Sequence, residues 1–185
     1  MMNNKNKKEK SVSEFRKDLV SGEWILISTK RKLRPRAFGK KKCIFEDPQK
    51  NENPFPVIWH PRPGKSNDFK NWFIQIIPNK FPVLQKSNFC PEISMQGPYE
   101  KVESTGFHEV IITRDHDRPI HKMTIEEISL VLRVYRDRYQ MLEKEKCIEY
   151  VLIFHNEGEL AGASILHPHS QLVAMPIVPP DVSGS

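Results

Sequence analysis

A short segment near the C-terminal end of the chain, His167-Pro168-His169-Ser170-Gln171, carries side chains that could do chemistry. Successive side chains of a β-strand point to opposite faces, so an extended segment would place His167, His169 and Gln171 on one face. Pro168 favours an extended conformation, because it fixes its own φ and keeps the residue before it out of the helical region. Two imidazoles and a carboxamide in one row could bind a metal ion, serve phosphate chemistry, or do both.

Two interpretations of the histidine pair stay open at this point. In the first, both imidazoles bind one metal ion, and a tetrahedral site takes its other ligands from elsewhere in the chain. The available candidates are Cys43, Glu46 and His116, and Cys43-x-x-Glu46 has the spacing of a Cys-x-x-Cys metal hook with its second thiolate replaced. In the second, one histidine is a ligand or is structural, and the other is a nucleophile, because neutral imidazole can attack phosphorus and form a covalent intermediate.

The second interpretation requires groups that bind phosphate, and the sequence offers three kinds. Gln171, on the same predicted face, could donate to a phosphate oxygen. The segment Gly162-Ala163-Ser164 could present backbone N–H groups to phosphate, as turn nests do. Arg31 and Arg34, which belong to a basic cluster, could supply positive charge through their planar forks of donors.

Several apolar runs predict the elements that must position these residues. Thr124 and Glu127 form a Thr-x-x-Glu capping box, and apolar residues then recur at helical spacing from Ile125 to Leu142. Segment 40–64 is rich in proline and polar residues, segment 85–105 is polar, and both are predicted to be irregular. The predicted strands cover residues 24–27, 71–77, 106–113, 149–154 and roughly 169–177. This pattern predicts an α+β fold with an antiparallel sheet and one long helix packed on it.

Length and composition predict one domain with a real core in a chain of 185 residues. No run of about 18 apolar residues is present, which argues against a membrane-spanning helix, and the N-terminus lacks the apolar stretch of a secretory signal. Three widely spaced cysteines, Cys43, Cys90 and Cys147, argue against a disulfide framework and favour the reducing cytoplasm. The net charge is +6, and half of it lies in residues 1–12, a predicted disordered tail; the remainder suits a small anionic substrate and not nucleic acid.

Beyond these patterns, the chain resembles the galactose-1-phosphate uridylyltransferases, which belong to the histidine-triad superfamily. The His-Pro-His-Ser-Gln segment and the residues before it carry the resemblance, and further blocks occur in the family's order over about residues 14–180. These blocks are Phe15-Arg16-Lys17-Asp18, Ser21-Gly22-Glu23-Trp24, Arg31-Lys32-Leu33-Arg34-Pro35, Pro78-Asn79-Lys80-Phe81-Pro82, Gly106-Phe107-His108-Glu109-Val110, Phe154-His155-Asn156-Glu157-Gly158 and Gly162-Ala163-Ser164.

The resemblance implies a fold and a role for each matching residue. It implies a HIT-like antiparallel sheet, a half-barrel, formed by residues 13–182 as the N-terminal domain of a family whose members have two related halves; the C-terminal half is expected to be missing from this chain. The implied catalytic residues are His169, the nucleophile, and Gln171, which holds the phosphoryl oxygens. The implied nucleotide- and phosphate-binding residues are Arg31, Arg34, Asn79, Asn156, Gly162 and Ser164. The implied zinc ligands are Cys43, His116 and His167, with Glu46 in place of the second cysteine of the hook.

The resemblance also implies a reaction. His169 would take UMP from UDP-glucose and pass it to galactose 1-phosphate, so that the partners would be a sugar nucleotide and a hexose 1-phosphate. Family members also dimerise, so a homodimer is expected for the full-length form. Two alternatives remain: an ADP-glucose phosphorylase or adenylyltransferase of the same superfamily, and a non-catalytic half-domain that binds nucleotide and zinc.

Overall fold

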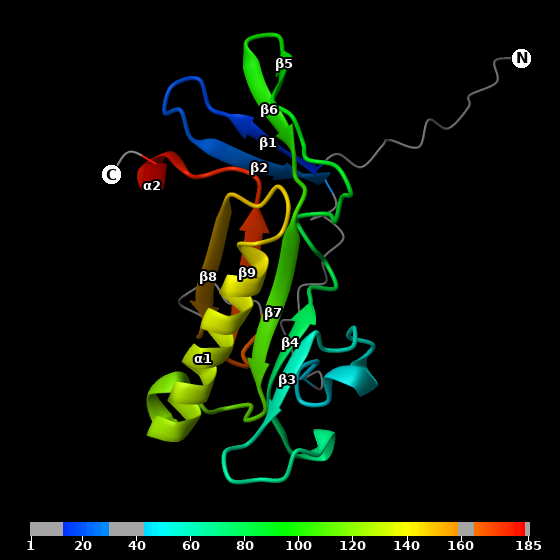
Figure 1. Ribbon diagram of the computed structural model, residues 1–185, viewed down its shortest axis with the longest axis vertical. Helices are drawn as coiled ribbons and strands as arrows, with labels where there is room; N and C mark the ends of the chain where they lie inside the picture. The colour runs from blue at the N-terminus through cyan, green and yellow to red at the C-terminus, as the bar shows by residue number, and fades with distance from the viewer. Residues whose placement is uncertain (1–12, 30–42, 159–164, 184–185) are drawn as a thin grey trace, which may run out of the picture.

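The protein, seen in a computed structural model that describes residues 13–29, 43–158 and 165–183, has two antiparallel sheets (Figure 1). The strand orders are β3-β4-β7-β9-β8 and β2-β1-β6-β5, and the long helix α1 lies against the first sheet. This confirms the predicted α+β class with a HIT-like antiparallel sheet and one long packing helix. The strands are β1 (Ser13–Lys17), β2 (Trp24–Ser28), β3 (Ile58–Pro61), β4 (Trp72–Pro78), β5 (Ser94–Gln96), β6 (Tyr99–Glu103), β7 (Phe107–Thr113), β8 (Tyr150–Asn156) and β9 (His169–Met175), and the helices are η2 (Pro48–Asn51), η3 (Phe69–Asn71), η4 (Ile120–Lys122), α1 (Ile125–Leu142) and α2 (Pro180–Ser183).

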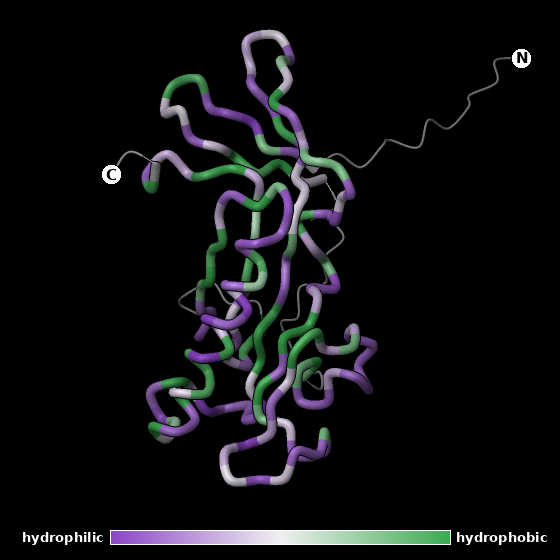
Figure 2. The backbone as a smooth tube through the Cα atoms, viewed as in Figure 1, coloured by the Kyte–Doolittle hydropathy of each residue, from purple (hydrophilic) through white to green (hydrophobic). Residues whose placement is uncertain are grey.

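The five-stranded sheet contains the main core. Strand β4 is buried at every position but its last, and β7 is buried from Glu109 to Thr113; Figure 2 shows hydrophobic stretches along both strands. On the face that α1 covers, Ile74, Ile76, Ile111 and Leu172 pack with Val131 of the helix. Full burial of a side chain of this size contributes about 1.5–3 kcal/mol of transfer free energy, so this layer fixes the helix on the sheet.

The helix begins where the capping box predicts. The Thr124 side chain accepts a hydrogen bond from the Glu127 N–H group, and the Glu127 carboxylate accepts one from the Thr124 N–H group. Val131 and Leu142 are buried as expected, whereas Ile125 is 80% exposed. The predicted apolar stripe was therefore wrong at Ile125, and it was also wrong at Leu132, which is 57% exposed.

The second sheet corrects part of the prediction. Segment 85–105, predicted to be irregular, contains β5 and β6, and segment 40–64 contains β3 as well as the short helix η2. Strand β6 pairs with β1, and Phe15 of β1 and Val102 of β6 belong to a second, smaller core that also contains Leu84, Val173 and Ile177. Strands β5 and β6 are short and polar. Their structure therefore depends on pairing with adjacent strands of the sheet rather than on a periodic apolar pattern of their own.

A disulfide joins Cys90 to Cys147, so the expectation that the cysteines form none was wrong. The two residues lie 57 positions apart, but the fold brings their Cα atoms to 5.2 Å. Sequence spacing carries no signal for such a pair, because only the approach of the loop before β5 to the end of α1 creates it. Cys43 is the free cysteine of the described chain.

Strands β7 and β9 approach closely where β7 begins. Gly106 has φ +136°, and a Cβ atom there would lie 2.1 Å from the Ala174 carbonyl oxygen. Only glycine fits this conformation and this approach. The tight contact brings β9, with its histidine and glutamine, directly alongside β7. Among the described residues, no helix is long and apolar enough to cross a membrane.

Candidate active site and metal centre

The strand register places the predicted catalytic residues on the face of the sheet that α1 does not cover. His169 lies opposite Ile112 of β7 and Asn156 of β8, and Gln171 lies opposite Val110 and Phe154 in the next row of the same face. Side chains directly opposite one another in an antiparallel pair share a face. The expected alternation is therefore confirmed from His169 onward.

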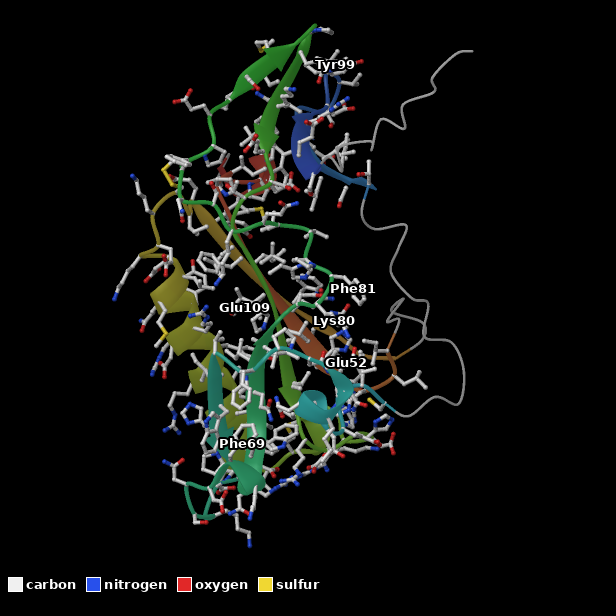
Figure 3. The ribbon with its side chains drawn as sticks, turned by 90° about the vertical axis from the view of Figure 1, so that its right-hand side faces the viewer. Glu52, Phe69, Lys80, Phe81, Tyr99 and Glu109 are labelled. Carbon is white, nitrogen blue, oxygen red and sulfur yellow. A yellow bond between two sulfur atoms is a disulfide. The ribbon has the colours of Figure 1, made fainter. Side chains whose placement is uncertain are left out.

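A pocket of about 200 Å³ opens on this face. Its apolar wall includes Phe45, Ile77 and Val110, and its polar groups include Asn79, His169 and Gln171. Figure 3 shows Glu52, Lys80 and Phe81 on this side of the sheet, away from Glu109 and α1, and Lys80 Nζ lies 3.1 Å from a Glu52 carboxylate oxygen. An apolar pocket with a few convergent polar groups is typical of a small-molecule site.

The tautomer of His169 follows from its backbone contact. The Nδ1 atom lies 2.9 Å from the His167 carbonyl oxygen, which can only accept a hydrogen bond. The proton of the neutral ring therefore sits on Nδ1, and the lone pair sits on Nε2. The ring of Phe45 packs against it with a centroid distance of 5.3 Å, which fixes its plane. His169 is 4% exposed and so is held in one orientation.

Two carboxamides flank His169 on this face. Gln171 Oε1 is engaged with His108 Nε2 at 2.8 Å. The Asn156 Nδ2 atom is buried and has no hydrogen-bond partner among the described residues. A buried amide donor without a partner is costly, so a ligand with acceptor oxygens would satisfy it.

Three potential metal ligands meet beside the pocket. One ligand atom each from Cys43, His116 and His167 lies within 4.8 Å of the others, and Cys43 Sγ is 3.5 Å from His167 Nδ1. His167 Nε2 donates to the Thr113 carbonyl oxygen at 2.7 Å, so its Nδ1 atom keeps the lone pair for a metal. Nδ1 of His116 is buried without a hydrogen-bond partner among the described residues. This donor set fits a zinc ion.

Glu46 lies next to the three ligands. One of its carboxylate oxygens is 3.5 Å from His116 Nδ1, close enough for an ion pair but not in hydrogen-bonding geometry. The other ring nitrogen of His116, Nε2, is 3.6 Å from an Asp117 oxygen. Glu46 thus lies beside His116, but it is not part of the group of ligand atoms formed by Cys43, His116 and His167.

Burial shifts the pKa of two of these ligands. It raises the pKa of the Cys43 thiol, and the N–H groups of Phe45 and Glu46 offset this only in part. It lowers the pKa of His167, despite the hydrogen bond to the Thr113 carbonyl, and keeps the ring neutral. A neutral imidazole is ready to bind a metal ion, whereas the thiol would release its proton on binding.

The structure separates the two histidines that the sequence placed in one row. Strand β9 begins at His169, so His167 lies before the strand and turns toward Cys43 and His116. His169 is not part of that group of ligand atoms. Of the two interpretations, the arrangement therefore favours a division of labour, although Phe45 contacts both rings.

The other face of the same strand is tied to the helix. Ser170 Oγ lies 2.5 Å from the Tyr135 hydroxyl and 2.9 Å from His155 Nδ1. Ser170 is 1% exposed, so these contacts are buried between β9, β8 and α1. These contacts fix β9 on the helix-covered face of the sheet, while His169 and Gln171 face the pocket on the opposite face.

Not every predicted residue can be placed. Arg31, Arg34, Gly162 and Ser164 lie outside the described residues. Asn79 lines the pocket, and its Oδ1 atom accepts a hydrogen bond from the Phe81 N–H group at 2.9 Å. Sequence reasoning assigned no role to His108, although it quoted this residue within a family block. One signal was available in the sequence: His108 lies two residues before Val110 and so shares its strand face, which is the face that Gln171 also occupies.

The five-stranded antiparallel sheet, the helix on one face and the His-x-His-x-Gln segment that leads into β9 define a histidine-triad-like domain. Comparison with known proteins gives the family. The family model described as "Galactose-1-phosphate uridyl transferase, N-terminal domain" matches residues 3–179. The chain therefore belongs to the galactose-1-phosphate uridylyltransferase family.

Individual relatives agree with this assignment. The chain is 30% identical to an ADP-glucose phosphorylase of Arabidopsis thaliana over 95% of its length and 52% of the relative. It is 29% identical to a galactose-1-phosphate uridylyltransferase of Thermotoga maritima over 90% of its length and 48% of the relative. The chain thus spans about half the length of these curated relatives.

Solved structures show the same fold. The match to a uridylyltransferase structure covers 92% of this chain and 48% of the uridylyltransferase chain, with 28% identity and a TM-score of 0.65. The match to an ADP-glucose phosphorylase of Arabidopsis thaliana with bound ADP-glucose covers 92% of this chain and 51% of the phosphorylase chain, with 28% identity and a TM-score of 0.60.

Proposed function

We propose that the protein transfers a nucleoside monophosphate from a sugar nucleotide through a covalent intermediate on His169. The observation that carries the proposal is the backbone contact of this residue: the His167 carbonyl holds the proton on Nδ1, so Nε2 has the lone pair of a nucleophile. His169 and Gln171 both line the pocket. The proposed donor is UDP-glucose and the proposed acceptor is galactose 1-phosphate.

Neither step of the proposed transfer requires a base to remove a proton. The Nε2 lone pair of His169 attacks the α-phosphorus of UDP-glucose, a P–N bond forms, and the bond to the bridging oxygen breaks. Glucose 1-phosphate leaves with that electron pair. The ring becomes positively charged, and the hydrogen bond from Nδ1–H to the His167 carbonyl stabilises it. A phosphate oxygen of galactose 1-phosphate then attacks the same phosphorus, and the P–N bond breaks to restore neutral His169.

Neighbouring amides would bind the developing charge. Asn156 lies opposite His169 on the adjacent strand, and its buried Nδ2 atom is a donor in need of an acceptor. Gln171 follows on the same face of β9. Donors fixed before the reaction stabilise charge without reorganising, and loss of one such donor costs about 10²–10³-fold in rate.

An adenine nucleotide is the second candidate donor. A relative named ADP-glucose phosphorylase aligns over 95% of the chain, and a structure with ADP-glucose bound has the same fold. In that case His169 would take AMP from ADP-glucose, and inorganic phosphate would be the acceptor that gives ADP. The chemistry at His169 is the same for both donors.

We further propose that Cys43, His116, His167 and Glu46 bind zinc. Zinc at this position would cross-link three chain segments and would not take part in the transfer itself. His167 would be held through the metal on one ring nitrogen and through the Thr113 carbonyl on the other. We also propose that the full-length form is a homodimer.

Intact-protein mass spectrometry tests the proposal. After incubation with UDP-glucose, the protein should gain the mass of a uridylyl group, in a linkage stable to alkali and labile to acid. Incubation with ADP-glucose in a parallel sample shows which nucleotide is accepted. His169→Ala should abolish the adduct, whereas His121→Ala, at an exposed position outside the site, should not. Nucleotide that binds to the wild type without forming an adduct would favour the non-catalytic half-domain instead.

A further inference from the structure

His108 lies beside the catalytic strand without lining the pocket. It belongs to β7, two residues before Val110, and Val110 lies directly opposite Gln171 of β9. The side chains of His108 and Gln171 are therefore diagonal neighbours on the same face of the sheet, a separation that long side chains can bridge. They do so, with His108 Nε2 at 2.8 Å from Gln171 Oε1.

A backbone amide determines the tautomer of His108. The Val83 N–H group donates to His108 Nδ1 at 3.0 Å, and an amide nitrogen cannot accept in return. Nδ1 must therefore carry the lone pair, and the proton of the neutral ring must sit on Nε2. Nε2–H then donates to Gln171 Oε1. The chain of hydrogen bonds runs in one direction, from Val83 through His108 to Gln171.

This direction matters because a carboxamide has two orientations of nearly equal shape. With Oε1 held by His108, the NH2 group of Gln171 is the part left to face the substrate. In the flipped orientation, Oε1 would meet the negatively charged phosphate oxygens and repel them. An amide donor at this place stabilises charge in the transfer, whereas a carbonyl oxygen opposes it.

Asn79 lies on the other side of the same ring. Its Nδ2 atom is 3.0 Å from His108 Nε2, while its Oδ1 atom accepts from the Phe81 N–H group. The proton on Nε2 leaves no lone pair there for Asn79, so this contact is not a hydrogen bond.

From these contacts we infer that His108 is a positioning residue, which holds the Gln171 carboxamide with its NH2 group toward the phosphate of the nucleotide. The inference rests on the proposed transfer through His169 and adds a residue to its machinery. His108 touches no reacting atom, and it acts through Gln171. A merely structural role would instead make its removal independent of Gln171.

Two substitutions separate the two hydrogen bonds of His108. In His108→Asn, the Asn Oδ1 atom can accept from the Val83 N–H group in place of Nδ1, but the donor to Gln171 is lost. In His108→Gln, the longer side chain can return an N–H group to Gln171. His60→Asn serves as a matched control, because His60 lies on β3 and its partner in the register, Ile74, belongs to the helix-covered face.

Single-turnover adduct formation measures the effect. His108→Asn should lower the rate constant of the first step by about 10–100-fold, with nucleotide affinity changed less than about 3-fold. His108→Gln should recover most of the rate, and His60→Asn should leave it unchanged. In the Gln171→Ala background, His108→Asn should have almost no further effect, because the group it positions is gone. Effects that multiply in the double variant would overturn the inference.

Nitrogen NMR of ¹⁵N-histidine-labelled protein decides the point without any transfer activity. The resonances lost in His108→Asn identify His108, and they should report a neutral ring with the proton on Nε2. A ring with its proton on Nδ1 would overturn the inference. If the wild type forms no adduct with either sugar nucleotide, the proposed function fails, and the tautomer alone then decides the role of His108.

Discussion

Glu127→Gln tests how strongly the loop that carries His116 is held in place. Arg62 contacts carboxylate oxygens of Asp115 and Glu127 at 2.6 and 2.5 Å, and Arg118 contacts the same two residues at 3.1 and 2.6 Å. Asp115 directly precedes His116 in the chain. The four charges thus join the residue after β3, the loop after β7 and the start of α1.

The burial of these groups sets the size of the effect. The Glu127 side chain is 5% exposed, while the side chains of Arg62 and Arg118 are 30% and 29% exposed. Removal of one partner from a fully buried pair costs about 3–5 kcal/mol, and the exposure of both arginines reduces the expected cost to about 2–3 kcal/mol. For a chain of this size, that corresponds to a fall in Tm of about 4–12 °C.

The effect should depend on pH in a defined direction. Burial alone would raise the pKa of Glu127, but hydrogen bonds from the Thr124 N–H group and Arg118, together with the positive charges, lower it below its ordinary value of 4.5. A depressed folded-state pKa contributes stability above the unfolded-state pKa, and this contribution is lost as the pH falls through the folded-state value. The difference between wild type and Glu127→Gln should therefore shrink in acid.

Urea unfolding at pH 7 and at pH 3, followed by circular dichroism, measures both effects. The neighbouring Glu126 is exposed, so Glu126→Gln is a matched control in the same helical turn and should cost less than about 0.5 kcal/mol. Equal costs for the two variants at pH 7 would refute the reasoning. So would a cost for Glu127→Gln that is as large at pH 3 as at pH 7.

Further predictions concern the metal centre, the disulfide and the sheet. His167→Ala should release bound zinc, whereas His169→Ala should retain it, as measured by metal analysis after dialysis; equal loss would return both histidines to the metal site. Cys147→Ser should lower the free energy of unfolding by about 2–4 kcal/mol in denaturant titrations, because it opens the disulfide loop; an unchanged value would contradict this. Gly106→Ala should cost more than about 3 kcal/mol or prevent folding, because its Cβ would meet a backbone oxygen at 2.1 Å. Gly64→Ala, with φ +77° and open space around it, should cost about 1 kcal/mol by the same unfolding assay, and similar costs would refute the packing argument.

Local signals in the sequence predicted much of the fold. The helix began where its capping box indicated, and the apolar runs around β4, β7 and β8 were found because their burial requires apolar residues. Strands β5 and β6 were not predicted, because their residues are mostly polar and exposed and Val102 is their one buried side chain. Their structure depends on pairing with β1, a contact between segments far apart in the chain.

The candidate site also has features that the sequence predicts and features that it does not. The alternation of His169 and Gln171 along one face could be predicted from strand geometry, whereas the partners of these side chains depend on the register between strands. His108 contacts Gln171 only because β7 and β9 pair with Val110 opposite Gln171. Likewise, no spacing rule brings Cys43 to His167, 124 positions later.

The two histidines of the central motif differ because β9 begins between them. His167, ahead of the strand, turns its ring toward the Thr113 carbonyl and Cys43, while its own carbonyl accepts the Nδ1 proton of His169. One residue thus links the candidate metal centre to the proposed nucleophile through its backbone. A metal bound at His167 would restrain the carbonyl that sets the tautomer of His169. The metal would then influence the transfer through the orientation of the nucleophile, without contact with the phosphate.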